Sequence, residues 1–193
     1  DAPVGLRTRE QLPPLPLTEH QLDRRAGRLA AIERDENRVH AFDLEGATRL
    51  ATLKLVGYAE TIHQLAPRMD PGGSVVLFGG RAKDRPYPGS TMVSTVNGGV
   101  TGLVHSLAVE LAPVRCNAIH PGIVGDSPYW SAKGEPALEP VRNRTPSRRL
   151  VTMEDIVGAV VFLLSHRSAY ITGTHLIADG GRTGCVPAGS IGV

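Results

Sequence analysis

The spacing of apolar residues changes between helical and extended periods along most of the chain. Between residues 47 and 66, apolar side chains recur at three- and four-residue intervals, which predicts a helix that ends at Pro67. The next apolar run, residues 74–78, is nearly continuous and is followed by Gly79 and Gly80. A short run of this kind is typical of a strand buried on both faces of a parallel sheet.

The rest of the chain continues this alternation. The further expected elements are a helix from Thr91 or Val96 to Leu111, a strand over 114–120, a helix from the Thr152/Asp155 capping box to Leu164, a strand over 174–178, and a weaker strand over 29–32. This order predicts an α/β fold, a parallel sheet covered by helices on both faces. Ligands of such sheets bind beyond the carboxyl ends of the strands.

Two regions do not follow the alternation. Residues 1–26 contain four prolines and no amphipathic period, so we expect an irregular N-terminal arm. Residues 121–150 hold five prolines and the single Trp of the chain, which indicates a long excursion with one short helix. The domain itself is expected over residues 27–182, and a tail over residues 183–193.

Composition narrows the class of protein. The chain has 193 residues, 41% of them apolar, which is enough for one domain with a sizeable core. Its 21 basic and 19 acidic residues nearly balance, so nothing indicates a nucleic-acid partner. The longest apolar run, residues 156–164, is too short to span a bilayer. Cys116 and Cys185 are too few for a disulfide framework or a metal site. We therefore expect a cytoplasmic protein that holds no metal and does not enter a membrane.

Three motifs follow one another in the second half of the chain. A helix ends in L-A-x-E-L-A-P at Pro113, the next strand reads R-C-N-A-I-H-P-G over 115–122, and the last one lies within I-T-G-x-x-x-x-x-D-G-G over 171–181. With these motifs, residues 27–182 resemble the short-chain dehydrogenase/reductases. The resemblance implies a Rossmann-like doubly wound parallel sheet, NAD or NADP as cofactor and a small-molecule carbonyl or alcohol substrate. It also implies a homodimer or homotetramer.

The motifs of that family's nucleotide-binding half do not occur here. A glycine-rich turn, G-x-x-x-G-x-G, binds the cofactor pyrophosphate through its backbone N–H groups, and no such turn is found in the sequence. The chain also begins with Asp and not with Met. We therefore expect the first βαβ portion to be absent or degraded, and the chain to be a C-terminal portion of a longer protein. The alternative is a protein that has lost the residues that usually bind the cofactor.

The catalytic positions of the family differ as well. In the family a Tyr donates the proton, a Lys four residues later lowers the pKa of the phenol, a Ser orients the carbonyl oxygen and an Asn holds a water. Alignment of the motifs puts Val93 at the Tyr position, Asn97 at the Lys position, Gly80 at the Ser position and Lys54 at the Asn position. Val93 has no proton to donate and Asn97 has no positive charge. The resemblance therefore implies a divergent, non-standard active site.

Other residues near the same strand ends are candidates for catalysis. Tyr87 and Lys83 follow Gly80 in a polar loop and offer a phenol and an ammonium group. A solvated loop is the alternative interpretation. His120 comes at a strand end and is a candidate substrate contact, against the alternative that it only forms a structural hydrogen bond.

The resemblance also implies where cofactor and substrate bind. The cofactor-binding positions are Gly79, Gly80, Pro121, Gly122, Ile123 and Val124. The excursion over 121–150 corresponds to the substrate lid of the family, and Tyr129 and Trp130 are candidates to close over an apolar or aromatic substrate. The alternative is that both rings cover the helix beneath them.

Three functions are open on this basis. The first is an NAD(P)-linked oxidoreductase of this superfamily with an unusual proton donor. The second is a non-catalytic relative that keeps the scaffold for binding or assembly. The third is a non-redox enzyme on the same scaffold, since a fold alone does not determine the chemistry of its site.

Overall fold

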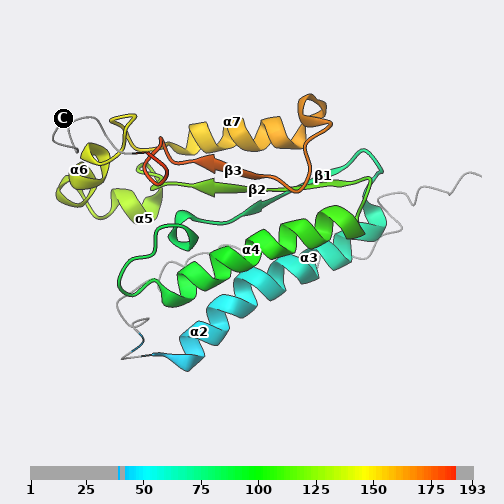
Figure 1. The fold of residues 1–193 in the computed structure, drawn as a ribbon, viewed down its shortest axis with the longest axis horizontal. Coiled ribbons are helices and arrows are strands. Elements are labelled where there is room, and N and C mark those ends of the chain that lie inside the picture. Colours follow the sequence, from blue (N-terminus) through cyan, green and yellow to red (C-terminus); the bar gives the residue numbers. More distant parts are fainter. Residues whose placement is uncertain (1–38, 40–41, 186–193) are drawn as a thin grey trace, which may run out of the picture.

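A parallel three-stranded sheet forms the centre of the computed structural model, which describes residue 39 and residues 42–185 (Figure 1). The strands are β1 (Ser74–Phe78), β2 (Arg115–Pro121) and β3 (His175–Ala178), in the order β1-β2-β3. In the register Val75 lies opposite Cys116, and Ala118 lies opposite His175. The three strands predicted within the described residues are confirmed to within a residue at each end.

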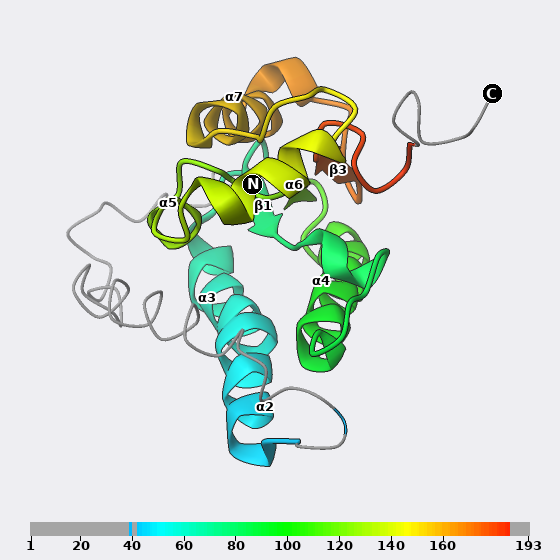
Figure 2. The same ribbon diagram turned by 90° about the vertical axis from the view of Figure 1, so that its left-hand side faces the viewer.

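One face of the sheet is covered by two long helical segments, which lie on the same side in Figures 1 and 2. The first runs through α2 (Leu44–Ala51), a π-helical turn (Thr52–Val56) and α3 (Gly57–Leu65), and the second is α4 (Thr91–Glu110). The helix expected over 47–66 is therefore present, and the second helix begins at the earlier of its two predicted starts. The core beneath these helices is aliphatic: Ile62, Leu77, Val100, Val104, Leu107, Cys116 and Ala118.

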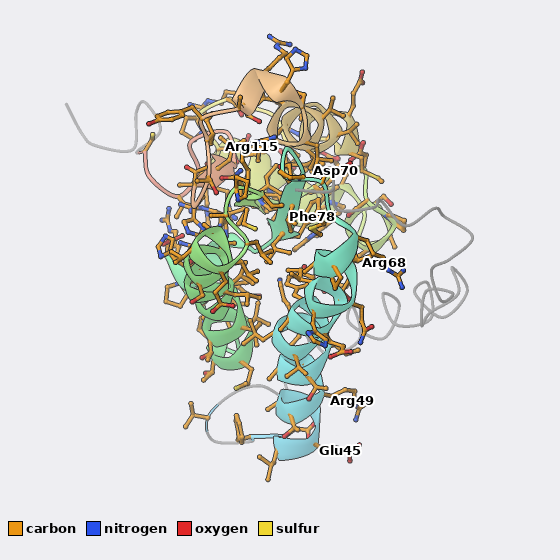
Figure 3. All side chains as sticks on the ribbon, turned by 90° about the vertical axis from the view of Figure 1, so that its right-hand side faces the viewer. Glu45, Arg49, Arg68, Asp70, Phe78 and Arg115 are labelled. Atoms are coloured by element: carbon orange, nitrogen blue, oxygen red, sulfur yellow. The ribbon has the colours of Figure 1, made fainter. Side chains whose placement is uncertain are left out.

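The opposite face is covered by α7 (Met153–Leu164). Its first turn has the predicted capping box, in which the Thr152 hydroxyl accepts from the Asp155 N–H and the Asp155 carboxylate accepts from the Thr152 N–H. At its other end the guanidinium of Arg115 donates to the carbonyl oxygens of Leu163 and Ser165, at 2.9 and 3.1 Å. Figure 3 shows Arg115 on the side of the sheet that faces α7.

The excursion after β2 lies beyond the carboxyl ends of the strands (Figure 1). It contains two helices, α5 (Pro128–Ser131) and α6 (Glu135–Asn143), so the expectation of a single short helix was wrong. A proline occupies the first turn of each helix, where the backbone N–H has no partner within the helix in any case. The proline therefore costs no hydrogen bond there, which explains how a proline-rich segment forms both helices.

Three expectations lie outside the described residues: the arm over 1–26, the strand over 29–32, and the tail beyond residue 185. Short 3-10 turns complete the described part, at Ala66–Arg68, Arg81–Lys83 and His166–Ser168. Within residue 39 and residues 42–185, no helix combines the length and apolar character that crossing a bilayer requires.

Candidate functional site

Gly79 and Gly80 directly follow the carboxyl end of β1, and His120 lies against them. A Cβ atom on Gly79 would overlap the imidazole of His120, a ring that is 0% exposed. The Gly80 N–H donates to His120 Nδ1 at 3.1 Å. The sequence thus requires glycine at position 79 because a buried ring fills the space of its side chain.

Lys54 and Asn97 meet beside Gly80, although they come from different helices. Lys54 Nζ donates to Asn97 Oδ1 at 2.7 Å, and Asn97 is only 3% exposed. A Cβ atom on Gly80 would lie 2.7 Å from the amide nitrogen of Asn97. Lys54 belongs to the π-helical turn between α2 and α3, and such turns occur frequently at functional sites.

Val93, the fourth residue placed by the motif alignment, is one helical turn before Asn97 on α4. It is 8% exposed and forms a small apolar cluster with Leu50 and Val96, against which Leu55 also packs. The tertiary structure therefore brings Lys54, Asn97 and Gly80 into contact and puts an aliphatic side chain on the adjacent turn.

Ion pairs of Arg81 hold the loop after Gly80 against the segment that follows β3, at the carboxyl edge of the sheet. Arg81 pairs with Asp84 at 2.7 Å and with the buried Asp179 of the segment after β3 at 3.2 Å. Burial raises the pKa of Asp179, but hydrogen bonds from Thr183 and from the Gly181 N–H, with the charge of Arg81, bring this pKa below its usual value. An ionised Asp179 therefore joins the two loops.

The two candidate catalytic residues of this loop differ in exposure, because Lys83 is partly buried and Tyr87 is exposed. Lys83 pairs with Asp84 at 2.8 Å, and its positive charge contributes to lowering the pKa of His120. Tyr87 is 53% exposed, and its backbone N–H donates to the hydroxyl of Ser90.

His120 is the first of three histidines in a chain. Its Nε2 lies 3.2 Å from Nδ1 of His175, and Nε2 of His175 lies 3.1 Å from Nε2 of His105. Burial lowers the pKa of His120 to about 4, with a further decrease from Lys83 and an opposing effect of the hydrogen bond to the Gly80 backbone. His175 has a lowered pKa for the same first reason, burial, and because of His105.

Tyr129 and Trp130 lie in α5, beyond the carboxyl ends of the strands (Figure 1). Their rings pack edge to face with centroids 5.3 Å apart, and the ammonium of Lys133 stacks on both rings at 4.4 and 4.7 Å. This cluster presents an aromatic surface that a positive charge already covers in part.

Residues 121–124 connect β2 to the excursion. Gly122 packs so closely on Asp179 that a Cβ atom would lie 3.0 Å from the Asp179 Cα, and the Gly122 N–H donates to Ala178 at 2.9 Å. Pro121, Ile123 and Val124 are half-buried, and Val124 forms an isolated bridge with Val151. The segment is thus held next to the end of β3.

Three polar residues of this region were not singled out from the sequence: Tyr58, His105 and His175. The Tyr58 hydroxyl donates to the carbonyl oxygen of Phe78 at 3.0 Å, at the end of β1 (Figure 3), and burial raises the pKa of its phenol. Tyr58 follows Lys54 by four residues, which puts both side chains on one side of the helical run. This four-residue spacing is a signal in the sequence that could have identified Tyr58. No local pattern links His105 to His175, since 70 residues separate them.

A parallel sheet with helices on both faces and a polar site at its carboxyl end defines a Rossmann-like α/β protein. A family model described as Enoyl-(Acyl carrier protein) reductase matches residues 26–183. The chain belongs to the short-chain dehydrogenase/reductases, as its motifs suggested.

Curated relatives of this family include 1-cyclohexenylcarbonyl-CoA reductase of Streptomyces collinus, which is 30% identical over 64% of this chain and 46% of its own length. Carbonyl reductase (NADPH) 2 of Sus scrofa is 34% identical over 56% of this chain and 46% of its own length. The chain therefore spans about half the length of these relatives.

Solved structures agree on the fold. An NAD+-bound xylitol dehydrogenase is 25% identical, with a TM-score of 0.69, and the match covers 75% of this chain and 63% of that one. A small-chain dehydrogenase in complex with NADPH has a TM-score of 0.71 at 23% identity, over 76% of this chain and 68% of that one.

Proposed function

We propose that this chain forms part of an NAD(P)-linked oxidoreductase that acts on a small carbonyl or alcohol substrate at the carboxyl end of its sheet. The observation that carries the proposal is the 2.7 Å hydrogen bond between Lys54 and Asn97 beside Gly80. Asn97 stands at the family's Lys position without a charge, and Lys54 brings an ammonium group to it from the neighbouring helix. A fixed cation there stabilises the negative charge that develops on a carbonyl oxygen.

Relatives support a nicotinamide cofactor, since one is named for NADPH and another was solved with NAD+. Gly80 is held against the Asn97 amide, which lies 2.7 Å from where a Cβ atom of Gly80 would be, so the residues of this strand end are packed closely together. By resemblance, Gly79, Gly80, Pro121, Gly122, Ile123 and Val124 would hold the nicotinamide end of such a cofactor. When bound, the cofactor supplies or accepts the hydride. The glycine-rich turn does not occur in the sequence, so the proposal assigns this chain no pyrophosphate contact.

Tyr87 and Lys83 are the proposed proton donor and its neighbouring cation. Lys83 lies close enough to the strand ends for its charge to act on His120 and His175. We expect Tyr87→Phe to lower kcat by about 100-fold or more, the usual contribution of a positioned general acid. Tyr170→Phe is the matched control, because Tyr170 is fully exposed and far along the chain, before β3. Equal activity of the two variants would show that Tyr87 is not the proton donor, and Tyr58 would then be the next tyrosine to replace.

The aromatic cluster of Tyr129, Trp130 and Lys133 supports the proposed substrate side of the site. Two rings packed edge to face under an ammonium favour a flat or apolar substrate that carries a negative group. Trp130→Ala should raise KM more than it lowers kcat, because it removes contact surface and no reacting group.

A homodimer or homotetramer is also proposed. Four large apolar side chains on α7 are exposed at spacings of three to four residues: Met153, Val157, Val161 and Leu164. A row of this kind is typical of a surface that a second copy covers. Light scattering on the purified protein measures the oligomeric state directly.

The deciding experiment compares wild type, Lys54→Met and Arg49→Met. Arg49 lies on α2 and pairs with the exposed Glu45, at the end of this helix far from the sheet (Figure 3). Titration with NADH and with NADPH, followed by nicotinamide fluorescence, measures binding, and a panel of carbonyls and alcohols measures turnover. We expect Lys54→Met to lower kcat/KM by about 100-fold and Arg49→Met to leave it unchanged.

The titrations use the whole protein of which this chain is proposed to be a part, and binding of neither cofactor by that protein would overturn the proposal in favour of a non-catalytic binding or assembly protein. One observation favours that second function: the aliphatic Val93 packs at the family's Tyr position, where a proton donor is needed. Cofactor binding without any redox turnover would favour a non-redox enzyme on the same scaffold.

A further inference from the structure

Three histidines from three different elements form a continuous hydrogen-bonded chain. His120 is the last residue but one of β2, His175 begins β3 and His105 lies on α4. The nitrogen–nitrogen distances between neighbours are 3.2 and 3.1 Å. Exposure increases along the chain, because His120 is fully buried, His175 is partly buried and His105 is exposed. The chain therefore runs from the interior of the sheet to solvent.

The backbone of Gly80 sets the tautomer of His120 and with it the direction of the hydrogen bonds in this chain. Nδ1 of His120 lies 3.1 Å from the Gly80 nitrogen and 3.4 Å from the Gly80 carbonyl oxygen. The shorter contact, in which the Gly80 N–H donates, favours the tautomer in which Nδ1 accepts and carries no proton. In a neutral ring the proton then sits on Nε2, which donates to Nδ1 of His175. By the same reasoning Nε2 of His175 donates to Nε2 of His105, and the remaining proton of His105 is on Nδ1.

The inner end of the chain lies at the candidate site. Gly80, which donates to His120, is also the residue whose missing side chain faces Asn97. On α4, Asn97, Thr101 and His105 follow at intervals of four residues, so one side of this helix carries polar groups from the Lys54–Asn97 pair to the outer histidine.

The three rings do not form a metal site. His175 uses its two nitrogens for two different neighbours, so the ring nitrogens do not converge on one point. Among the described residues, no group of three or more histidine, cysteine or carboxylate side chains has the arrangement of a metal site.

We propose that His120, His175 and His105 are a proton path between the site at Gly80 and solvent. When Nδ1 of His120 takes up a proton in place of the Gly80 hydrogen bond, the Nε2–H bond of His120 breaks as an Nδ1–H bond forms on His175. The Nε2–H bond of His175 then breaks as an Nε2–H bond forms on His105, and His105 releases its Nδ1 proton to water. One proton enters, one leaves, and no electrons are transferred; transfer in the opposite sense follows the same bonds in reverse.

Burial is the main reason that His120 and His175 are neutral at rest, and most of the charged groups around them act in the same direction. Arg81 and Lys83, from the turn after β1, both disfavour a protonated His120, and Lys83 with His105 disfavours a protonated His175. Asp84 has the opposite, weaker effect on His175. A proton therefore passes through His120 and His175 without staying there, which a conducting path requires.

The path goes beyond the proposed oxidoreductase function and is tested without cofactor or substrate. Nitrogen-15 NMR of the imidazole rings assigns the proton-bearing nitrogen of each histidine and measures the exchange of the His120 Nε2 proton with water. We expect Nε2–H on His120 and on His175, and Nδ1–H on His105. We expect His175→Gln to slow exchange of the His120 proton by at least about tenfold, because an amide oxygen accepts the hydrogen bond but passes no proton on.

Two further variants separate a proton path from a purely structural role. His105→Gln alters only the exposed end of the chain and should also slow the exchange, which keeps the test available if His175→Gln does not fold. His63→Gln, an exposed histidine on α3, is the control and should have no effect. Backbone amide exchange in β2 should be equal in all folded variants. An Nδ1–H tautomer of His120, or unchanged His120 exchange in both chain variants, would overturn the proposal.

Discussion

Lys54 Nζ and Asn97 Oδ1 lie 2.7 Å apart, across the interface between the π-helical turn that precedes α3 and the first half of α4. The motif alignment predicts a lysine where the family has an asparagine and an asparagine where it has a lysine. In the structure these two residues are in direct contact.

This exchange predicts a specific pattern of stabilities. Lys54→Met leaves the carboxamide oxygen of the buried Asn97 without its donor and should lower the free energy of unfolding by about 1–3 kcal/mol. Asn97→Lys alone puts two ammonium groups together and should cost at least as much. The double variant Lys54→Asn/Asn97→Lys restores a lysine–asparagine pair and should recover most of the loss in urea unfolding. Additive losses in the double variant would show that the two residues do not act as a pair.

Gly79 should not tolerate even one added methyl group. In Gly79→Ala the new Cβ overlaps the His120 ring, which is fully buried and has no room to move, so the free energy of unfolding should fall by at least about 2 kcal/mol. Gly102→Ala is the control, because Gly102 lies within α4 with no atom within 4 Å of the new methyl. This variant should raise stability by about 0.5–1 kcal/mol. Equal stabilities of Gly79→Ala and wild type would contradict the close packing.

The stability of the protein should decrease below about pH 6.5, partly because of His120. Its pKa is about 4 in the folded protein and about 6.5 in an unfolded chain, so the unfolded state binds the extra proton between these values. The contribution is complete above pH 6.5 and is lost as the pH falls towards 4, with a slope of up to about 1.4 kcal/mol per pH unit. In His120→Gln this part of the slope should be absent. NMR titration of the His120 Cε1–H in wild type provides a direct reading, and a midpoint near 6.5 would contradict the prediction.

Arg115 should not be replaceable by lysine. Its guanidinium donates to Leu163 and Ser165 carbonyl oxygens and to the Ser168 hydroxyl, so one planar group satisfies the C-terminal end of α7. Arg115→Lys keeps the charge but not this geometry and should cost about 1–3 kcal/mol in thermal or urea unfolding. Arg49→Lys, at an exposed position, should change stability by less than about 0.5 kcal/mol.

The alternation of apolar spacing predicted the strands and helices around the site because each pattern is local. The run over 74–78 became β1 and the Thr152/Asp155 box starts α7, since a few neighbouring side chains decide burial and capping. The second helix of the excursion was not expected, because prolines that end a helix elsewhere lie in its first turn and at Pro140.

The site depends on contacts between residues that are far apart in the sequence, and no local sequence pattern predicts which of them meet. Motif alignment put Lys54, Asn97, Gly80 and Val93 at the family's four catalytic positions. It treated each as a separate loss of a catalytic side chain. Only packing of α4 against the π-helical turn puts Lys54 and Asn97 within hydrogen-bonding distance, and only the pairing of β2 with β3 under α4 aligns His120, His175 and His105. Local spacing therefore determines the elements, whereas the distance between two side chains 43 or 70 residues apart is set by how those elements pack.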